Sequence, residues 1–146
     1  HVEFTYTAGM DEATVERRLR EAETGVLSLA DGDDAYGVPL AFHYDGGDAI
    51  LLRLGRVQDS EKLAYVQSTD RACFVVYDYA SPRESWSVLV TGELERVPEG
   101  DARHDDAEIN RAFPDLRVFD EDVAELEIEL YELRMETVTG RETLDE

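Results

Sequence analysis

The chain has 146 residues, 42% of them hydrophobic, which is enough for one domain (1–146) built around a single core. Its 35 acidic and 14 basic residues give a formal net charge of −21 at pH 7. Such a surface repels nucleic acid and anionic membranes, and no apolar run approaches the ~18 residues of a membrane-spanning helix. These features exclude a nucleic-acid or membrane partner and predict a soluble globular domain.

The acidic residues are spread along the chain, and Lys62 is its only lysine. This composition is typical of proteins from extreme halophiles, whose acidic surfaces stay hydrated in molar salt. At ~1 M salt the screening length is about 3 Å, so repulsion between these charges is largely suppressed. No segment has the pattern of a signal peptide, and we expect a halophilic, cytoplasmic protein.

The N-terminal residues 1–10 alternate in polarity, which predicts an edge strand or a partly ordered arm. A helix follows, with Asp11 as its N-cap and Gly25 at its end. The apolar period then changes to that of strands, over 25–30, 36–45 and 49–55, with turn residues between them. This pattern predicts a three-stranded antiparallel meander.

Pro39 lies inside the second strand of this meander. Proline cannot donate a hydrogen bond to a central ladder, so it is confined to edges, strand starts or bulges. We therefore predict that the strand has an open edge at Pro39, where a planar ligand could lie.

The rest of the pattern is a short helix over 60–68, strands over 72–79 and 86–97, a polar helix over 101–112 and a final strand over 124–139. In the final strand the alternation slips by one residue at Tyr131-Glu132, which predicts a β-bulge. About six antiparallel strands with few helices predict a mainly β protein, a small β-barrel.

The main candidate for a binding site is Asp59-Ser60-Glu61-Lys62, between a strand and a helix. Backbone N–H groups, a hydroxyl and an ammonium there could converge on a phosphate. The alternative is that Ser60 caps the helix and Lys62 is one exposed charge. A bound phosphate needs a second cation in so acidic a protein, and Arg53 and Arg56 are equal candidates, although Arg53 would also suit the solvent face of a strand.

Metal and thiol chemistry find little support in the sequence. His43 and His104 have no second His or Cys at metal-ligand spacing, so we predict no protein-bound metal. Cys73 is the only cysteine and lies in an apolar run, which predicts a buried thiol without a disulfide.

The order of these pieces resembles the pyridoxamine 5′-phosphate oxidase-like flavin-binding split barrels, particularly their small archaeal members. The resemblance covers about residues 11–141. The segments that carry it are Gly25-Val26-Leu27-Ser28-Leu29, Tyr36-Gly37-Val38-Pro39-Leu40-Ala41-Phe42, Ser60-Glu61-Lys62, Trp86-Ser87-Val88-Leu89-Val90-Thr91-Gly92 and Thr139-Gly140-Arg141. The resemblance implies a six-stranded antiparallel split barrel of the FMN-binding type, and a homodimer with two FMN molecules at the subunit interface.

Carried over to this sequence, the resemblance implies a set of cofactor-binding residues. Those beside the flavin ring would be Val38, Pro39, Leu40 and Ala41, and those that hold the phosphate would be Ser60, Lys62 and either Arg53 or Arg56. Ser87 and Trp86 would contact the ring or the ribityl chain, although Trp86 would equally suit the core or the dimer interface.

The implied function is that of an FMN-dependent oxidoreductase that acts on a small-molecule substrate or electron donor, with no catalytic residue identified. One alternative keeps the fold but binds deazaflavin F420, or haem with His43 as the axial ligand. Another is a non-enzymatic flavin carrier, a redox sensor or a cofactor-free interaction module.

Overall fold

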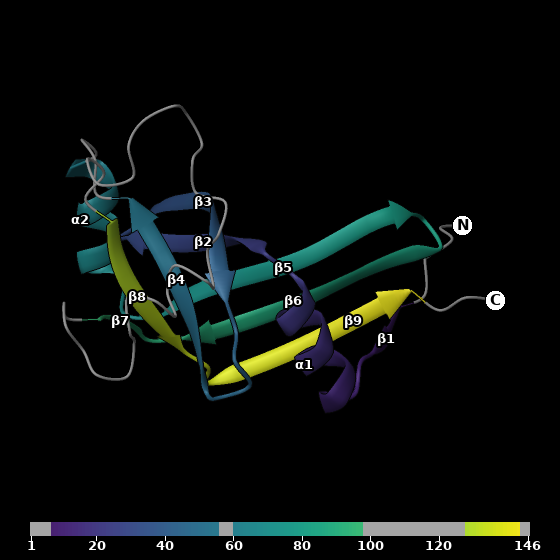
Figure 1. The fold of residues 1–146 in the computed structure, drawn as a ribbon. Coiled ribbons are helices and arrows are strands. Elements are labelled where there is room, and N and C mark those ends of the chain that lie inside the picture. The colour runs from purple at the N-terminus through teal and green to yellow at the C-terminus, as the bar shows by residue number, and fades with distance from the viewer. Residues whose placement is uncertain (1–6, 56–59, 98–127, 144–146) are drawn as a thin grey trace, which may run out of the picture.

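The computed structural model describes residues 7–55, 60–97 and 128–143, which form two helices and nine strands. The helices are α1 (Glu12–Glu21) and α2 (Ser60–Ser68). The strands are β1 (Thr7–Gly9), β2 (Thr24–Asp31), β3 (Asp34–His43), β4 (Ala49–Gly55), β5 (Ala72–Ser81), β6 (Glu84–Gly92), β7 (Leu94–Arg96), β8 (Ile128–Arg134) and β9 (Thr137–Thr143). They form one antiparallel sheet in the order β1-β9-β6-β5-β2-β3-β4-β8-β7 (Figure 1).

Two pairs of these strands are single strands with a bend. β6 continues into β7 through Glu93, and β8 continues into β9 through Met135 and Glu136. The two bent strands stay hydrogen-bonded at the bend, because Arg134 N–H donates to Glu93 C=O and Glu136 N–H donates to Thr91 C=O, both at 2.9 Å. With each counted once, they close a ring of six with β2, β3, β4 and β5. The mainly β, six-stranded antiparallel split barrel is confirmed.

Gly92 makes the crossing of the two bent strands possible. A Cβ on Gly92 would lie 1.5 Å from the carbonyl oxygen of Arg134 and 3.2 Å from the nitrogen of Glu136. Only glycine lets the second strand lie directly against the first at this point.

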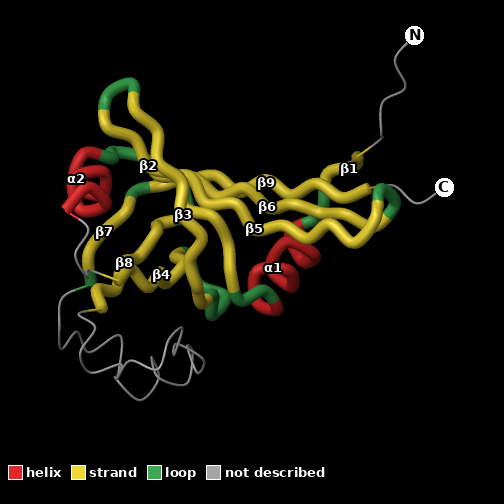
Figure 2. Tube along the Cα trace, turned by 90° about the horizontal axis from the view of Figure 1, so that it is seen from above, coloured by secondary structure: helices red, strands yellow, loops and turns green. Residues whose placement is uncertain are grey.

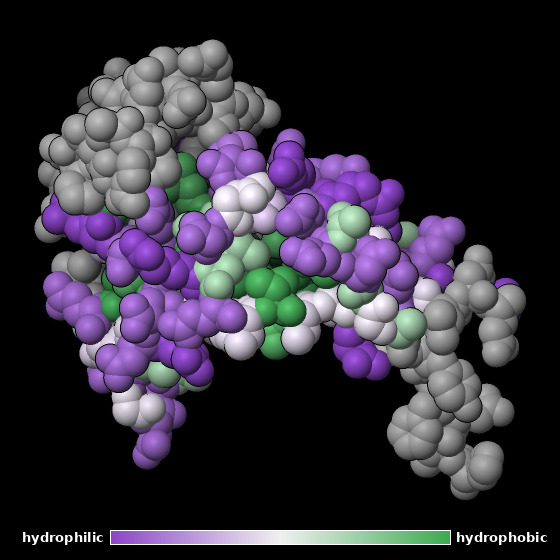
Figure 3. All heavy atoms as spheres, turned by 90° about the horizontal axis from the view of Figure 1, so that it is seen from below, coloured by the Kyte–Doolittle hydropathy of each residue, from purple (hydrophilic) through white to green (hydrophobic). Residues whose placement is uncertain are grey.

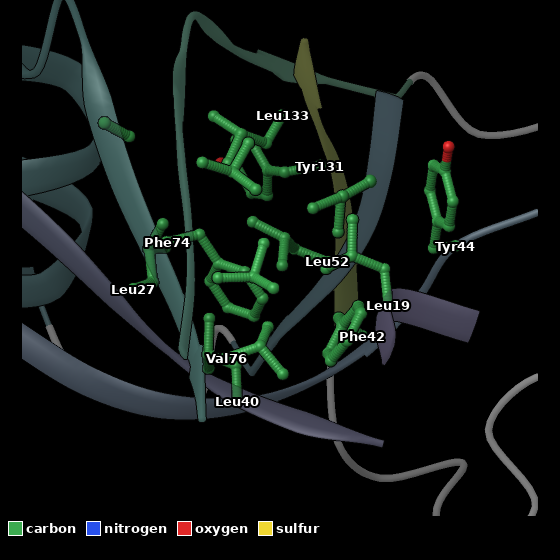
Figure 4. Packing of buried hydrophobic residues seen from close by; sticks show 14 of the residues in the cluster. Leu19, Leu27, Leu40, Phe42, Tyr44, Leu52, Phe74, Val76, Tyr131 and Leu133 are labelled. Carbon is green, nitrogen blue, oxygen red and sulfur yellow. The ribbon is translucent and has the colours of Figure 1, made fainter. Parts of the chain in front are cut away.

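The core fills the ring (Figure 4). Leu27, Leu52, Phe74 and Leu133 are fully buried, and Figure 4 shows them pointing toward one another from β2, β4, β5 and β8. Phe74 meets Phe42 edge to face, with ring centroids 5.1 Å apart and an interplanar angle of 73°. Burial of each such side chain stabilises the fold by ~1.5–3 kcal/mol, so this cluster dominates the stability of the barrel.

Beyond the ring, β5, β6 and β9 extend together as an arm, and α1 lies against one face of it (Figures 1 and 2). β1 pairs with β9 at the edge of the arm, and residues 1–6 of the predicted N-terminal strand or arm lie outside the described residues. α2 lies at the opposite end of the molecule, beside the β2–β3 hairpin (Figure 2). The predicted polar helix over 101–112 falls outside the described residues.

The start of α1 is as predicted and its end is not. Asp11 is the N-cap, and its Oδ1 accepts a hydrogen bond from Thr14 N–H at 2.8 Å. The C-cap is Ala22, so the predicted helix end at Gly25 is wrong. Gly25 lies in β2, where a Cβ would come within 2.4 Å of Cζ of Phe74, and close packing against this ring is the physical reason for the glycine.

The predicted bulge in the last strand is also wrong. β8 pairs with β4 without a register shift from Ile128 to Arg134. The alternation slips because Tyr131, Glu132 and Leu133 are all buried, with Glu132 only 8% exposed on the outer side of the barrel. β8 is therefore covered on both faces at this point. In the sequence alone, a strand that is buried on both faces cannot be distinguished from a strand with a bulge.

Candidate cofactor site

The barrel opens between β3 and β4. The two strands pair only at Phe42 with Leu52 and at His43 with Leu51. Beyond these pairs β4 stays with β8 as far as Gly55, whereas β3 stays with β2 as far as Asp34. The described part of the chain thus has a split that begins beside Ala41, and the predicted open edge at Pro39 lies along it.

The residues of this edge alternate in direction. Phe42 N–H donates to Glu23 C=O on the β2 side at 3.0 Å. Because N–H and C=O groups of every second residue in an antiparallel strand point to the same side, those of Leu40 and Val38 also point to β2. The N–H and C=O of Ala41 and the C=O of Pro39 point to the split. Proline therefore stands where no N–H is needed for the β2 ladder.

Their side chains alternate as well. Leu40 is 8% exposed and belongs to the core, and Val38 packs against that core. Pro39 is exposed on the outer side, and Ala41 packs against a small outer cluster of Leu51 and Val97. Of the four predicted ring-contact residues, Pro39 and Ala41 thus direct backbone groups to the split and side chains to the outer face.

Arg53 is a buried cation on the outer side of β4. It lies between the core residues Leu52 and Leu54, and its relative exposure is 9%. Continuing the register from Phe42 and Leu52 brings Arg53 level with Ala41 across the split. Burial lowers the pKa of the guanidinium from its usual value, but arginine stays charged at physiological pH. The alternative that Arg53 occupies a solvent-exposed strand face is therefore wrong.

The predicted phosphate segment lies at the start of α2, whose bounds of Ser60–Ser68 match the predicted helix. Ser60 and Lys62 are in its first turn, although their side chains are not among those that the structure describes. Arg56 lies outside the described residues. The chain passes from the end of β4 at Gly55 to the start of α2 at Ser60, so the helix begins close in sequence to the split.

Trp86 and Ser87 lie on opposite faces of β6. Trp86 faces α1, packs against the core and carries Arg18 over its ring. Ser87 is half-buried on the outer face, in register with Tyr77 and Arg141. The two side chains therefore lie on opposite sides of the sheet, Trp86 with α1 and Ser87 on the outer face.

Sequence reasoning missed the residues that attach α2 to the barrel. Thr69, directly after α2, bonds to Ala30 in β2, and Tyr65 of α2 stacks on Tyr36 of β3. These partners are far apart in sequence and share no local pattern, so no signal in the chain could have paired them.

The described residues have neither a metal-ligand cluster nor a membrane-spanning helix. In the described residues no group of three or more His, Cys, Asp and Glu is placed to hold a metal ion. The same part of the chain has no helix that is long and apolar enough to cross a membrane. Cys73 is half-buried in β5, and desolvation raises the pKa of its thiol.

The bent strands, the split and the helix that follows it define a split-barrel protein. A family model described as pyridoxamine 5′-phosphate oxidase matches residues 11–142. The chain therefore belongs to the pyridoxamine 5′-phosphate oxidase family, as the resemblance in its sequence indicates. No curated protein sequence gives a significant match.

Solved structures of low sequence identity share the fold. A FAD-binding protein from Mesorhizobium loti superposes with a TM-score of 0.78 at 18% identity, covering 96% of this chain and 98% of that one. The FAD-binding protein from Mycobacterium smegmatis gives 0.62 at 16% identity, over 93% and 98%. The FAD and heme binding protein from the same organism gives 0.68 at 14% identity, over 94% and 73%.

Proposed function

We propose that the protein binds a flavin, FMN, at the split between β3 and β4 and acts as a flavin-dependent oxidoreductase. The observation that carries the proposal is the end of β3–β4 pairing at Phe42 and Leu52. Beyond this point the backbone groups of Ala41 and Pro39 point to the split, and Arg53 of β4 lies level with Ala41 across it. The names of the three solved structures above, which specify FAD or FAD and haem, also support a flavin.

The strand edge suits the polar side of a flavin ring. The ring carries both donors and acceptors, and Ala41 offers one N–H and one C=O while Pro39 offers a C=O. Pro39 and Ala41 also place apolar side chains on the outer side, against which a planar ring can pack.

The phosphate would be held at the start of α2. The first N–H groups of a helix and its dipole favour an anion, and Ser60 and Lys62 add a hydroxyl and an ammonium. Arg53 is the described candidate for the second cation, and Arg56 remains the other. Cations are needed there because the chain as a whole carries −21.

The position of Ser87 supports a site shared by two copies in a homodimer. On the outer face Ser87 pairs with Tyr77 of β5, and Ala41 of β3 pairs with Thr24 of β2. Continuing the β2–β5 register by two residues beyond Val26 and Val75 would set Thr24 beside Tyr77. Three strand spacings separate Ser87 from Ala41 by ~14 Å, too far for one flavin ring to bridge easily within one chain. A second copy would bring its Ser87 to the ring that Ala41 contacts.

An exposed apolar surface supports the same homodimer. Tyr77 and Tyr79 are each 62% exposed and Leu89 is 40% exposed, all on the outer face of the arm. Hydrophobic atoms are also exposed in the middle of the molecule when it is seen from below, with hydrophilic atoms around them (Figure 3). Leu89→Glu would place a charge on this face, and light scattering in molar KCl should then show a monomer that has lost flavin. A dimer of unchanged affinity and flavin content would contradict this arrangement.

The flavin, when bound, supplies the electron chemistry, and the residues of this chain hold it and limit the access of water. Bleaching of the flavin absorption by NADH or NADPH without oxygen, and its return with an acceptor, would show an oxidoreductase. Bound flavin that no donor reduces would instead show a carrier or sensor.

Lys62 offers the sharpest test of the binding mode because the chain has no other lysine. Lys62→Gln removes the charge, and Lys62→Arg keeps it with a different shape. We expect Lys62→Gln to raise the dissociation constant for FMN at least tenfold, or ~1.4 kcal/mol, and Lys62→Arg to raise it less. Full FMN affinity in Lys62→Gln, measured by flavin fluorescence in molar KCl, would contradict the proposed phosphate site.

A further inference from the structure

Thr69 fastens the end of α2 to the sheet. Its N–H donates to Tyr65 C=O at 3.1 Å, as in a further helical turn. Its hydroxyl oxygen accepts from Ala30 N–H at 3.0 Å, and the hydroxyl proton lies within reach of the carbonyls of Tyr65 at 2.6 Å and Ala30 at 3.1 Å. One side chain therefore closes the helix and joins it to β2.

Ala30 needs such a partner because β5 begins one residue too late to supply one. β5 pairs with Val26, Leu27 and Ser28 of β2 and begins at Ala72. By that register Ala30 would face residue 71, which precedes the strand. The N–H and C=O of Ala30 point away from β3, to the side on which β5 pairs with β2. The hydroxyl of Thr69 bonds to them in place of a neighbouring strand.

A second contact joins α2 to the other strand of the same hairpin. Tyr65 of α2 stacks on Tyr36 of β3, with ring centroids 5.0 Å apart and an interplanar angle of 16°. Both rings are half-buried and pack against the core. The helix is thus held to β2 through Thr69 and to β3 through Tyr65.

These two contacts connect α2, where the phosphate is proposed to bind, to the β2–β3 hairpin, where the flavin ring is proposed to bind. The β2–β3 hairpin carries Pro39 and Ala41, which edge the split, and it also carries Ala30 and Tyr36. α2 is nine residues long, about 13 Å, so a small rotation at its attached end displaces its first turn by a larger distance. The spacing between flavin ring and phosphate therefore depends on how this helix is attached.

We propose that Thr69 and Tyr65 are positioning residues that set the place of the first turn of α2 and thereby select a flavin that carries a phosphate. This inference rests on the proposed function, in which Ser60 and Lys62 hold that phosphate. In this proposal both residues act through the helix and not by contact with the cofactor.

The test compares FMN with riboflavin, which has the same ring and ribityl chain but no phosphate. Dissociation constants are measured by flavin fluorescence in molar KCl for the wild type and for Thr69→Val, Thr69→Ser and Tyr65→Leu. We expect Thr69→Val and Tyr65→Leu to weaken FMN binding about tenfold with little change for riboflavin, and Thr69→Ser to restore the preference. The matched control is Asp11→Ala, which removes the cap of the other helix and should lower Tm without changing the FMN-to-riboflavin ratio.

The outcomes separate the two proposals. A wild type that prefers FMN while Thr69→Val and Tyr65→Leu keep the same preference would overturn the positioning role and leave the phosphate site intact. A wild type that binds riboflavin as tightly as FMN would overturn the phosphate site itself. Equal weakening of both flavins in Thr69→Val and Tyr65→Leu would show a general loss of structure and also overturn the positioning role.

Discussion

The guanidinium carbon of Arg18 lies 4.9 Å from the centroid of the Trp86 ring, so a charged residue of α1 covers the only tryptophan of the chain. The pair joins α1 to β6 on the face opposite Ser87. It also explains how an arginine can turn toward the sheet, because its long stem and flat head pack on the aromatic surface.

Removal of Arg18 should expose Trp86. We expect Arg18→Ala to lower the free energy of unfolding by ~1–2 kcal/mol, through lost packing and lost cation–π attraction, and to shift tryptophan emission to longer wavelength. Arg17→Ala is the matched control, because Arg17 is exposed on the same helix. Emission that is the same in both variants and in the wild type would show that Arg18 does not cover the ring in solution.

The bend of the barrel should not tolerate a side chain at Gly92. A Cβ there would lie 1.5 Å from Arg134 C=O, so Gly92→Ala must push the two bent strands apart. We expect a loss of ~3 kcal/mol or more in urea unfolding, or no folded protein at all. Gly9→Ala provides the control, because a Cβ on Gly9 meets nothing within 4 Å. Similar stability of the two variants would contradict the crossing at Gly92.

The thiol of Cys73 should react slowly while the protein is folded. Desolvation raises its pKa, so the folded state keeps the proton at a pH where an unfolded cysteine, with a pKa of about 8.5, begins to lose it. Because of this difference in pKa, Cys73 contributes to the stability of the folded state below the pKa of the unfolded cysteine. The contribution is lost as the pH rises through the pKa of the folded state. Alkylation by iodoacetamide should be slower in the folded than in the urea-unfolded protein, and Cys73→Ser should weaken the loss of stability at high pH. Equal alkylation rates would contradict the raised pKa.

Salt should stabilise the protein strongly if its acidity is an adaptation to saline solvent. The charge of −21 is self-repulsive, and raising KCl to ~1 M shortens the screening length to about 3 Å. We expect Tm to rise steadily from dilute buffer to molar KCl. The triple variant Asp31→Asn, Asp33→Asn, Asp34→Asn removes exposed charges at the β2–β3 turn and should gain stability mainly at low salt. A Tm independent of KCl would argue against a halophilic protein.

The local elements could be predicted because their signals are local. The bounds of α2 follow from its helical spacing, and the N-cap at Asp11 follows from residue type alone. Pro39 correctly predicts the open edge, because the missing N–H is a property of the residue itself. The overall split barrel follows from the order of these elements together with the resemblance to a family.

Contacts between distant segments could not be predicted in this way. Gly25 has the appearance of a helix end, and only the ring of Phe74 explains its place in β2. The slip at Tyr131-Glu132 has the appearance of a bulge, because burial on both faces of β8 erases the usual alternation. The attachment of Thr69 to Ala30 depends on where β5 begins, which is a property of the assembled sheet.

Flavin binding at the split is tested most directly by the visible absorption spectrum of the protein purified in molar salt, together with the mass of any ligand released on denaturation. We expect a flavin spectrum and the release of FMN in stoichiometric amount, or uptake of added FMN to that level. Released FAD would support flavin binding but contradict FMN as the cofactor. Released deazaflavin or haem would contradict flavin binding and leave only the barrel fold unchanged. A colourless protein that does not take up added FMN would contradict flavin binding at the split.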